Sequence, residues 1–126
     1  MIDFDTMGDW LDEIAEQFPQ EFYRELSGGI ALLPEAMPDP EFPEGEMYFL
    51  GEYCNNELGR YINLYYGSFA ALFADASDEE LYDELYTTLA HEFTHHLESL
   101  AGERGLEVKD ELELLEFRQM FEEEQE

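Results

Sequence analysis

A pair of histidines at helical spacing is the part of this sequence best suited to chemistry. Residues 91–95 read His-Glu-Phe-Thr-His, and the third and last histidine of the chain, His96, follows directly. On an α-helix, His91 and His95 project from one face about 6 Å apart, so both imidazoles can bind a single Zn²⁺ ion. Glu92 would then lie beside the ion, where it can take a proton from zinc-bound water. The spacing therefore predicts a zinc site with a catalytic carboxylate.

The alternative is that the three histidines are surface or hydrogen-bonded core residues of an ordinary amphipathic helix. A short motif of this kind also arises by chance. The chain has no histidine elsewhere, and the surrounding residues have helical periodicity. Both observations favour the zinc site.

The motif requires a helix, and the residues before it predict one. Ser77 is a suitable N-cap, and three acidic residues follow it in the first turn. Leucine or phenylalanine then recurs every four residues, at positions 81, 85, 89, 93 and 97. This stripe would be buried, with the two histidines to one side of it and within reach of solvent. We expect the helix to begin near Asp78 and to be broken by Gly102 and Gly105.

The remaining pattern predicts an α+β domain. Apolar residues at three- and four-residue steps indicate a helix from about Asp5 to Leu26, broken at Pro19. Three strands are expected at residues 30–33, 47–53 and 60–66, with a proline-rich loop at 34–46, a turn at 55–59, and a last helix at about 108–124. Residues 69–74 fit either a helical turn or an apolar loop. We expect one domain over residues 1–126, with a mixed sheet of about three strands, helices at both ends and a solvated acidic tail at about 122–126.

Composition narrows the possible partners. The chain has 33 acidic and 5 basic residues, for a net charge of -28. Such a surface disfavours nucleic acid and anionic membranes and favours basic peptides. There is no apolar run of membrane-spanning length and no signal-peptide pattern, so we expect a cytoplasmic protein. Cys54 is the single cysteine, which excludes an internal disulfide, and its acidic neighbours make it a poor nucleophile.

Four stretches of the chain resemble one known family. They are residues 51–53 (Gly-Glu-Tyr), 62–67 (Ile-Asn-Leu-Tyr-Tyr-Gly), 78–81 (Asp-Glu-Glu-Leu) and 88–96 (Thr-Leu-Ala-His-Glu-Phe-Thr-His-His). Together they resemble the minimal zincins, which are small bacterial zincin-like metallopeptidases, over roughly residues 15–112. The resemblance implies a short α+β fold whose sheet packs on the motif helix, and it implies peptide-bond hydrolysis.

The third metal ligand is where the sequence departs from that family. In minimal zincins a glycine three residues after the second histidine ends the helix, and an aspartate soon afterwards supplies the ligand. Here the glycine position is Glu98, and Asp110 matches the aspartate if the intervening loop is longer. We rank Asp110 first. The other candidates are Glu113, Glu116, Glu107, Glu98 and Glu103.

These residues predict a zinc-dependent metallopeptidase in which Glu92 is the general base. An extended peptide would add to an exposed sheet edge, which we expect at Tyr61–Tyr66. Tyr65 or Tyr66 could assist the oxyanion. His96 is expected either to support a metal ligand without binding the ion or to lie at the surface. The competing hypothesis is a zinc-stabilised interaction or regulatory module without hydrolytic activity. Retention of Glu92 favours the enzyme, because a purely structural zinc site needs no such carboxylate.

Overall fold

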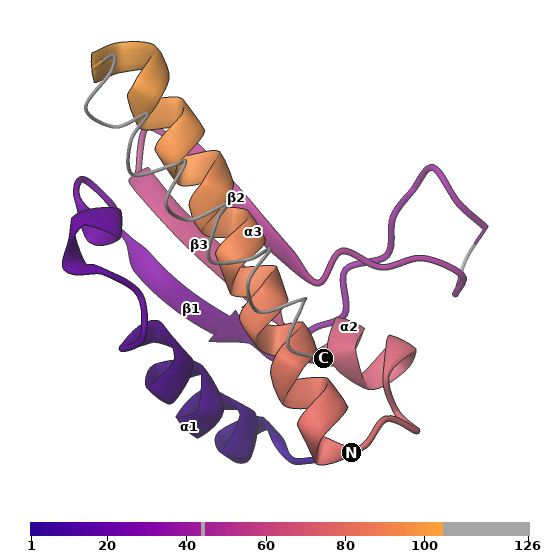
Figure 1. Ribbon diagram of the computed structural model, residues 1–126. Coiled ribbons are helices and arrows are strands. Elements are labelled where there is room, and N and C mark those ends of the chain that lie inside the picture. The colour runs from indigo at the N-terminus through magenta and orange to yellow at the C-terminus, as the bar shows by residue number, and fades with distance from the viewer. Residues whose placement is uncertain (44, 105–126) are drawn as a thin grey trace.

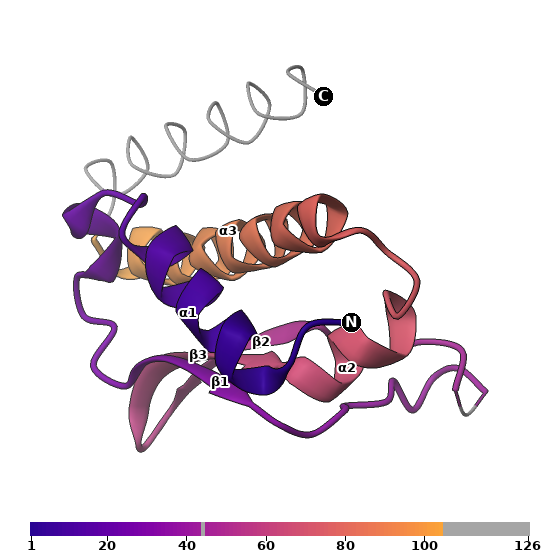
Figure 2. The same ribbon diagram turned by 90° about the horizontal axis from the view of Figure 1, so that it is seen from below.

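A three-stranded sheet with helices packed on one side forms the framework of the protein (Figures 1 and 2). The computed structural model describes residues 1–43 and 45–104. In chain order the elements are α1 (Phe4–Ala15), the 3₁₀ helix η1 (Gln20–Tyr23), β1 (Gly29–Leu33), β2 (Gly51–Asn56), β3 (Gly59–Tyr65), α2 (Tyr66–Leu72) and α3 (Asp78–Arg104). Helices α1 and α3 lie on the same side of the sheet (Figure 2). The expected α+β class is confirmed, and the predicted last helix lies outside the described residues.

The strand order is β1-β3-β2, with β1 parallel and β2 antiparallel to β3. Two residues connect β2 to β3, and the turn closes on Gly59, whose φ of +111° suits glycine. β1 has to reach β3 by a long connection because parallel strands cannot be joined by a tight turn. Because β3 lies between the other two strands, it is the central strand of the sheet. The prediction that Tyr61–Tyr66 forms an exposed edge is wrong, and the edges belong to β1 and β2.

The second strand begins later than predicted. We expected residues 47–53, whereas β2 covers Gly51–Asn56. Residues 47–49 instead pair loosely with residues 37–39, through a bridge between Pro38 and Tyr48 and a 2.8 Å hydrogen bond from the Phe49 N–H to the Met37 carbonyl. This arm, residues 34–43 and 45–49, extends away from the sheet (Figure 1). An apolar run that is strand-like in composition therefore lies mostly outside the sheet.

The helical stretch expected from about Asp5 to Leu26 is broken near Pro19 as predicted: α1 ends at Ala15, and the 3₁₀ helix η1 follows the proline. Proline disfavours helical geometry in the residue before it, here Phe18, and lacks the N–H that a continuing helix needs. The chain turns, and η1 brings the Tyr23 hydroxyl to the Ala15 carbonyl as a hydrogen-bond donor. This bond satisfies a carbonyl that the end of α1 leaves without a helical partner.

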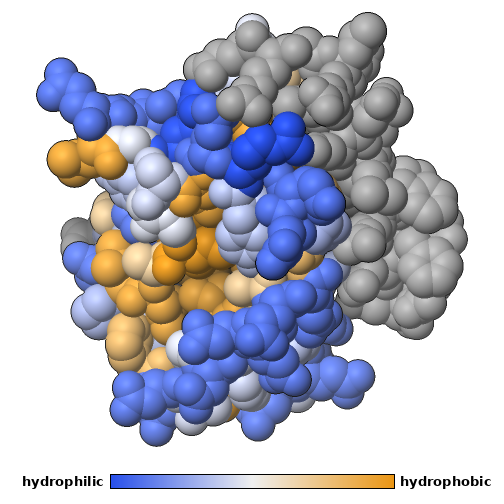
Figure 3. Space-filling model, turned by 90° about the vertical axis from the view of Figure 1, so that its left-hand side faces the viewer, coloured by the Kyte–Doolittle hydropathy of each residue, from blue (hydrophilic) through white to orange (hydrophobic). Residues whose placement is uncertain are grey.

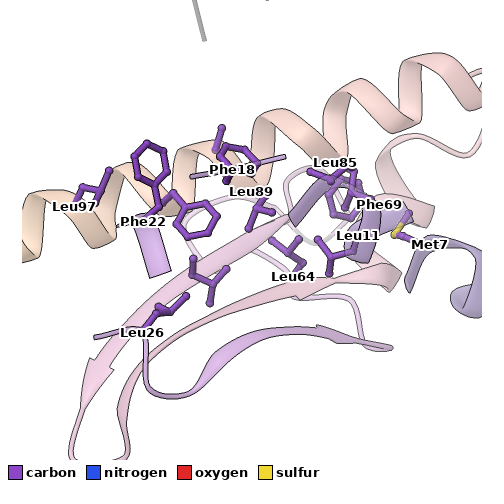
Figure 4. Close-up of a cluster of buried hydrophobic side chains, with 14 of the residues drawn as sticks. Met7, Leu11, Phe18, Phe22, Leu26, Leu64, Phe69, Leu85, Leu89 and Leu97 are labelled. Carbon is purple, nitrogen blue, oxygen red and sulfur yellow. The ribbon is translucent and has the colours of Figure 1, made fainter. Parts of the chain in front are cut away.

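Helix α3 follows its predicted start but not its predicted end. The Ser77 side chain accepts a 3.1 Å hydrogen bond from the Glu80 N–H, as expected of an N-cap. The helix continues through Gly102 to Arg104, so the predicted break at Gly102 is wrong. Its apolar stripe is fully buried, and Figure 4 shows Leu85, Leu89 and Leu97 of this stripe facing the core.

The core lies between α3, α1 and the inner face of the sheet (Figure 4). Its buried side chains include Met7, Leu11, Ile14, Phe18, Phe22, Leu26, Ile62, Leu64, Phe69, Leu81, Leu85, Leu89, Phe93, Leu97 and Leu100. Residues 69–74, which had two interpretations, lie largely in α2, and Phe69 is one of these core residues. Burying this cluster fixes the distance between α3 and the sheet, and thereby the position of the motif.

β1 is an apolar edge strand. All five of its residues are half-buried, and the face on the left of Figure 1 carries an apolar area bordered by hydrophilic residues (Figure 3). Among residues 1–43 and 45–104, no helix combines the length and the apolar character needed to span a membrane.

Candidate metal and catalytic site

The two motif histidines converge on one point outside the core. The Nε2 atoms of His91 and His95 are 3.0 Å apart, and the two rings are nearly perpendicular. Two nitrogens bound tetrahedrally to one zinc at about 2.05 Å would lie about 3.3 Å apart, so the pair already has nearly the required spacing. Both side chains are exposed. Burial of the ring, followed by the neighbouring imidazole, lowers the pKa of His91 and favours the neutral form that binds metal.

Glu92 lies beside this pair and is 6% exposed. Burial raises the pKa of its carboxyl to about 7, and the negative charge of Glu52 raises it further. A hydrogen bond from the backbone N–H of Tyr53 acts in the opposite direction. The result is a carboxyl group that can both accept and release a proton near neutral pH.

The histidines and Glu92 open into a cleft of about 700 Å³ between α3 and β2. Its described lining residues are Phe49, Gly51, Glu52, Tyr53, His91, Glu92, His95, Glu98 and Ser99. Three of these are acidic and none is lysine or arginine. The cleft therefore favours a cationic or neutral ligand over an anionic one.

A second hollow, of about 790 Å³, lies at the junction of α1 and η1. Its lining includes Phe18, Tyr23 and Arg24 but neither of the motif histidines. It therefore lacks the groups on which the predicted chemistry depends, and we place the site in the histidine cleft.

Strand β2 runs along α3 with every second residue directed at the helix. The Tyr65 N–H bonds to the Leu50 carbonyl, which sets the alternation of hydrogen-bonded pairs along the two strands. The backbone groups of the even-numbered residues of β2 therefore bond to β3. Those of Gly51, Tyr53 and Asn55 point away from β3, toward the open edge of the sheet. A methyl group on Gly51 would lie 3.1 Å from the Thr88 side chain, which shows how closely strand and helix approach. This close approach brings the Tyr53 N–H to Glu92.

His96 lies on the buried side of the helix and has no exposed surface. Its Nε2 donates to the Arg24 carbonyl at 2.8 Å, because a carbonyl can only accept. Its Nδ1 lies 2.9 Å from the Tyr53 hydroxyl. Burial lowers the pKa of His96, so the ring is neutral and Nδ1 accepts from Tyr53. These contacts are compatible with the expected supporting role, and the alternative of a surface position is wrong because the ring is fully buried.

The described residues supply two candidate metal ligands, His91 and His95, and no third. Among residues 1–43 and 45–104, no three histidine, cysteine, aspartate or glutamate side chains are grouped closely enough to hold an ion. Glu98 lies 3.9 Å from Nδ1 of His95, the ring nitrogen that does not face His91, so it is placed to orient that ligand. The candidates Asp110, Glu107, Glu113 and Glu116 lie outside the described residues, and so does the side chain of Glu103.

Two other predicted groups are directed elsewhere. The Tyr65 hydroxyl donates to Glu52 at 3.1 Å, and the Tyr66 hydroxyl donates to the Ile2 carbonyl at 2.6 Å. Neither tyrosine lines the cleft, so an oxyanion role for them is not supported. Cys54 is half-buried and its pKa is raised, chiefly by burial, as expected of a poor nucleophile.

No protein-family model matches the sequence, and no curated protein matches it either. Among solved structures, a conserved hypothetical protein from Thermo thermophilus is 34% identical to this chain, with a TM-score of 0.72. The match covers 80% of this chain and 99% of that one. The chain belongs to the family of this protein. The relative's name states no activity, so the function of the family has to be argued from the site itself.

Sequence reasoning missed the contribution of Tyr53 and Glu52 to the site. Both lie in the Gly-Glu-Tyr stretch that contributed to the family resemblance. That stretch was a usable signal, but only the contacts between β2 and α3 show that it borders the motif helix.

Proposed function

We propose that the protein is a zinc-dependent metallopeptidase. His91 and His95 would hold the ion with Asp110 as third ligand, and Glu92 would be the general base. The observation that supports this most directly is the convergence of two exposed imidazole nitrogens beside a buried carboxyl group whose pKa is raised to about 7. A purely structural zinc site gains nothing from such a carboxyl group.

When bound, zinc would polarise the scissile carbonyl and make the attacking water more acidic. Glu92 would take the proton from that water as it attacks and later give it to the departing amine. Both transfers need a group with a pKa close to the working pH, which burial provides for Glu92. Glu98 would orient His95 from the far side of its ring.

The shape and charge of the cleft support an extended, basic peptide as substrate. β2 is an edge strand that borders the cleft, and the backbone groups of Gly51 and Asn55 face outward from the sheet. A peptide could pair with this edge rather than with the central strand. Acidic groups on both walls would attract lysine or arginine side chains.

The test begins with metal binding. Purified protein should bind about one zinc per chain, and His91→Ala or His95→Ala should weaken binding by at least tenfold. Glu92→Gln should retain zinc and lose hydrolysis of a mixed peptide library, because an amide cannot accept the proton. Glu79→Gln, an exposed residue of the same helix, is the matched control and should retain both properties.

The outcomes separate the two hypotheses. A wild-type protein that binds zinc but cuts no peptide would support the zinc-stabilised interaction module instead. A protein that binds no zinc would exclude both. Single alanine variants of Asp110, Glu107, Glu113 and Glu98 then identify the third ligand. If Asp110→Ala binds zinc as tightly as wild type while another variant loses it, that other residue is the ligand.

A further inference from the structure

The buried histidine beside the motif is connected to the proposed general base through one tyrosine. Tyr53 contacts two residues of α3 that lie one turn apart, Glu92 and His96. Its backbone N–H bonds to the Glu92 carboxylate, and its hydroxyl bonds to His96 at 2.9 Å. The strand therefore meets the helix at two points through a single residue.

The geometry of His96 leaves little freedom for this connection. The ring is fully buried, and its Nε2 is held by the Arg24 carbonyl at 2.8 Å, which leaves Nδ1 as an acceptor directed at β2. The Tyr53 ring packs against the imidazole with centroids 5.3 Å apart. The Arg24 carbonyl thus holds the His96 ring in place, and the ring holds the Tyr53 hydroxyl.

The backbone N–H of Tyr53 depends on the restraint that His96 places on the side chain. Its N–H faces outward because Tyr53 and Ile62 are a non-hydrogen-bonded pair of the β2–β3 ladder. Among the described strands, none pairs with the outer side of β2 to hold that N–H in position. The direction of the N–H therefore depends on contacts between β2 and α3.

We infer that His96 is a positioning residue for Glu92: by holding the Tyr53 hydroxyl it keeps the Tyr53 N–H directed at the Glu92 carboxylate. The catalytic meaning of this connection rests on the proposed function. The connection itself is a property of the metal-free protein and can be measured without zinc or substrate.

The first experiment is amide NMR of the metal-free protein. Tyr53→Phe removes one oxygen atom, and His96→Phe removes both ring hydrogen bonds. In each variant, the chemical shift of the residue 53 amide proton should change toward its value in Glu92→Ala, where the acceptor is missing. The same proton should exchange with solvent at least tenfold faster than in wild type. Tyr66→Phe is the matched control, since it loses a comparable hydroxyl bond, to Ile2, and neither residue is among those that line the cleft.

If the residue 53 amide moves in Glu92→Ala but is unchanged in Tyr53→Phe, the inference is overturned. Tyr53→Phe decides the matter even if His96→Phe does not fold. With zinc and a peptide substrate, Tyr53→Phe should lower kcat at least tenfold and leave KM and the zinc Kd unchanged, and an unchanged kcat would also overturn the inference. A wild-type protein that cuts no peptide would overturn the proposed function, and the NMR result would still decide the connection.

Discussion

At the scale of single residues, Tyr23 shows how the environment of one hydroxyl makes stability depend on pH. Burial raises the pKa of Tyr23 to about 12, with a smaller contribution from the charge of Glu16. In the unfolded chain a tyrosine titrates near 10. Between these values the unfolded state loses a proton that the folded state keeps. The stabilisation is complete below about pH 10 and is lost as pH rises toward 12.

We predict that Tyr23→Phe lowers the free energy of unfolding by about 1 kcal/mol at pH 8, because the Ala15 carbonyl loses the hydroxyl donor and keeps the longer bond, 3.4 Å, from the Phe18 N–H. The variant should also lose part of the decline in stability between pH 10 and 12. Urea denaturation across this range is the measurement, with Tyr48→Phe, on the arm, as control. Tyr65 has a pKa raised to about 12 by burial and by Glu52, so some decline remains. An identical pH dependence in wild type and variant would contradict the prediction.

The sequence predicts those parts of the site whose residues lie close together along the chain, and not those that depend on contacts between distant segments. The positions of His91, Glu92 and His95 follow from helical geometry alone, and the structure brings all three together. The role of Tyr53 could not be predicted, because it depends on which backbone N–H groups of β2 face outward. The register of the β2–β3 hairpin sets that choice, and the packing of β2 against α3, which is distant in the chain, brings the Tyr53 N–H to Glu92.

At the scale of elements, the close contact of β2 with α3 is made possible by Gly51. A methyl group there would lie 2.6 Å from the Leu64 side chain and 3.1 Å from that of Thr88. We predict that Gly51→Ala destabilises the protein by about 1–3 kcal/mol, through overpacking. It should also weaken the bond between the Tyr53 N–H and Glu92, visible as faster exchange of that amide.

Gly8→Ala is the matched control for this prediction. Gly8 lies inside α1, and a methyl group there would meet nothing within 4 Å. The same substitution should therefore stabilise the protein by up to about 1 kcal/mol through helix propensity. Thermal denaturation of the two variants should give shifts of opposite sign, and a stabilised Gly51→Ala would show that β2 can move away from α3 without cost.

The elements that were predicted well are those specified by local pattern. The start of α3 follows from its cap and its apolar stripe, whereas its continuation through Gly102 does not follow from residue type. The apolar run at residues 47–50 has strand-like composition, but these residues precede the first residue of β2, Gly51. Composition indicates that a segment can form a strand, and packing decides whether it does.

At the scale of the whole molecule, a net charge of -28 should influence which peptides reach the cleft. We predict that lysine-rich peptides are cut with a kcat/KM at least tenfold higher than glutamate-rich peptides at low salt, through faster encounter. The difference should shrink toward 1 M salt, where the Debye length is about 3 Å. Equal values at low salt would refute the prediction.

The same charge bears on the apolar edge at β1 (Figure 3). An unpaired apolar edge strand can pair with another chain unless something opposes the approach. Repulsion between copies carrying 33 acidic residues each opposes it. The charge therefore has a second effect, separate from any effect on peptides.

The strand order also determines when the sheet can form. β2 and β3 are joined by a two-residue turn and can pair as soon as both exist, whereas Ile30 of β1 must find Ile62 across the whole arm and hairpin. Pulsed hydrogen exchange during refolding should therefore show β1 amides protected after those of β2 and β3. During synthesis, β1 leaves the ribosome first and waits, with its apolar residues unpaired, until β3 has emerged. This interval is when a nascent chain is most exposed to aggregation and most in need of a chaperone.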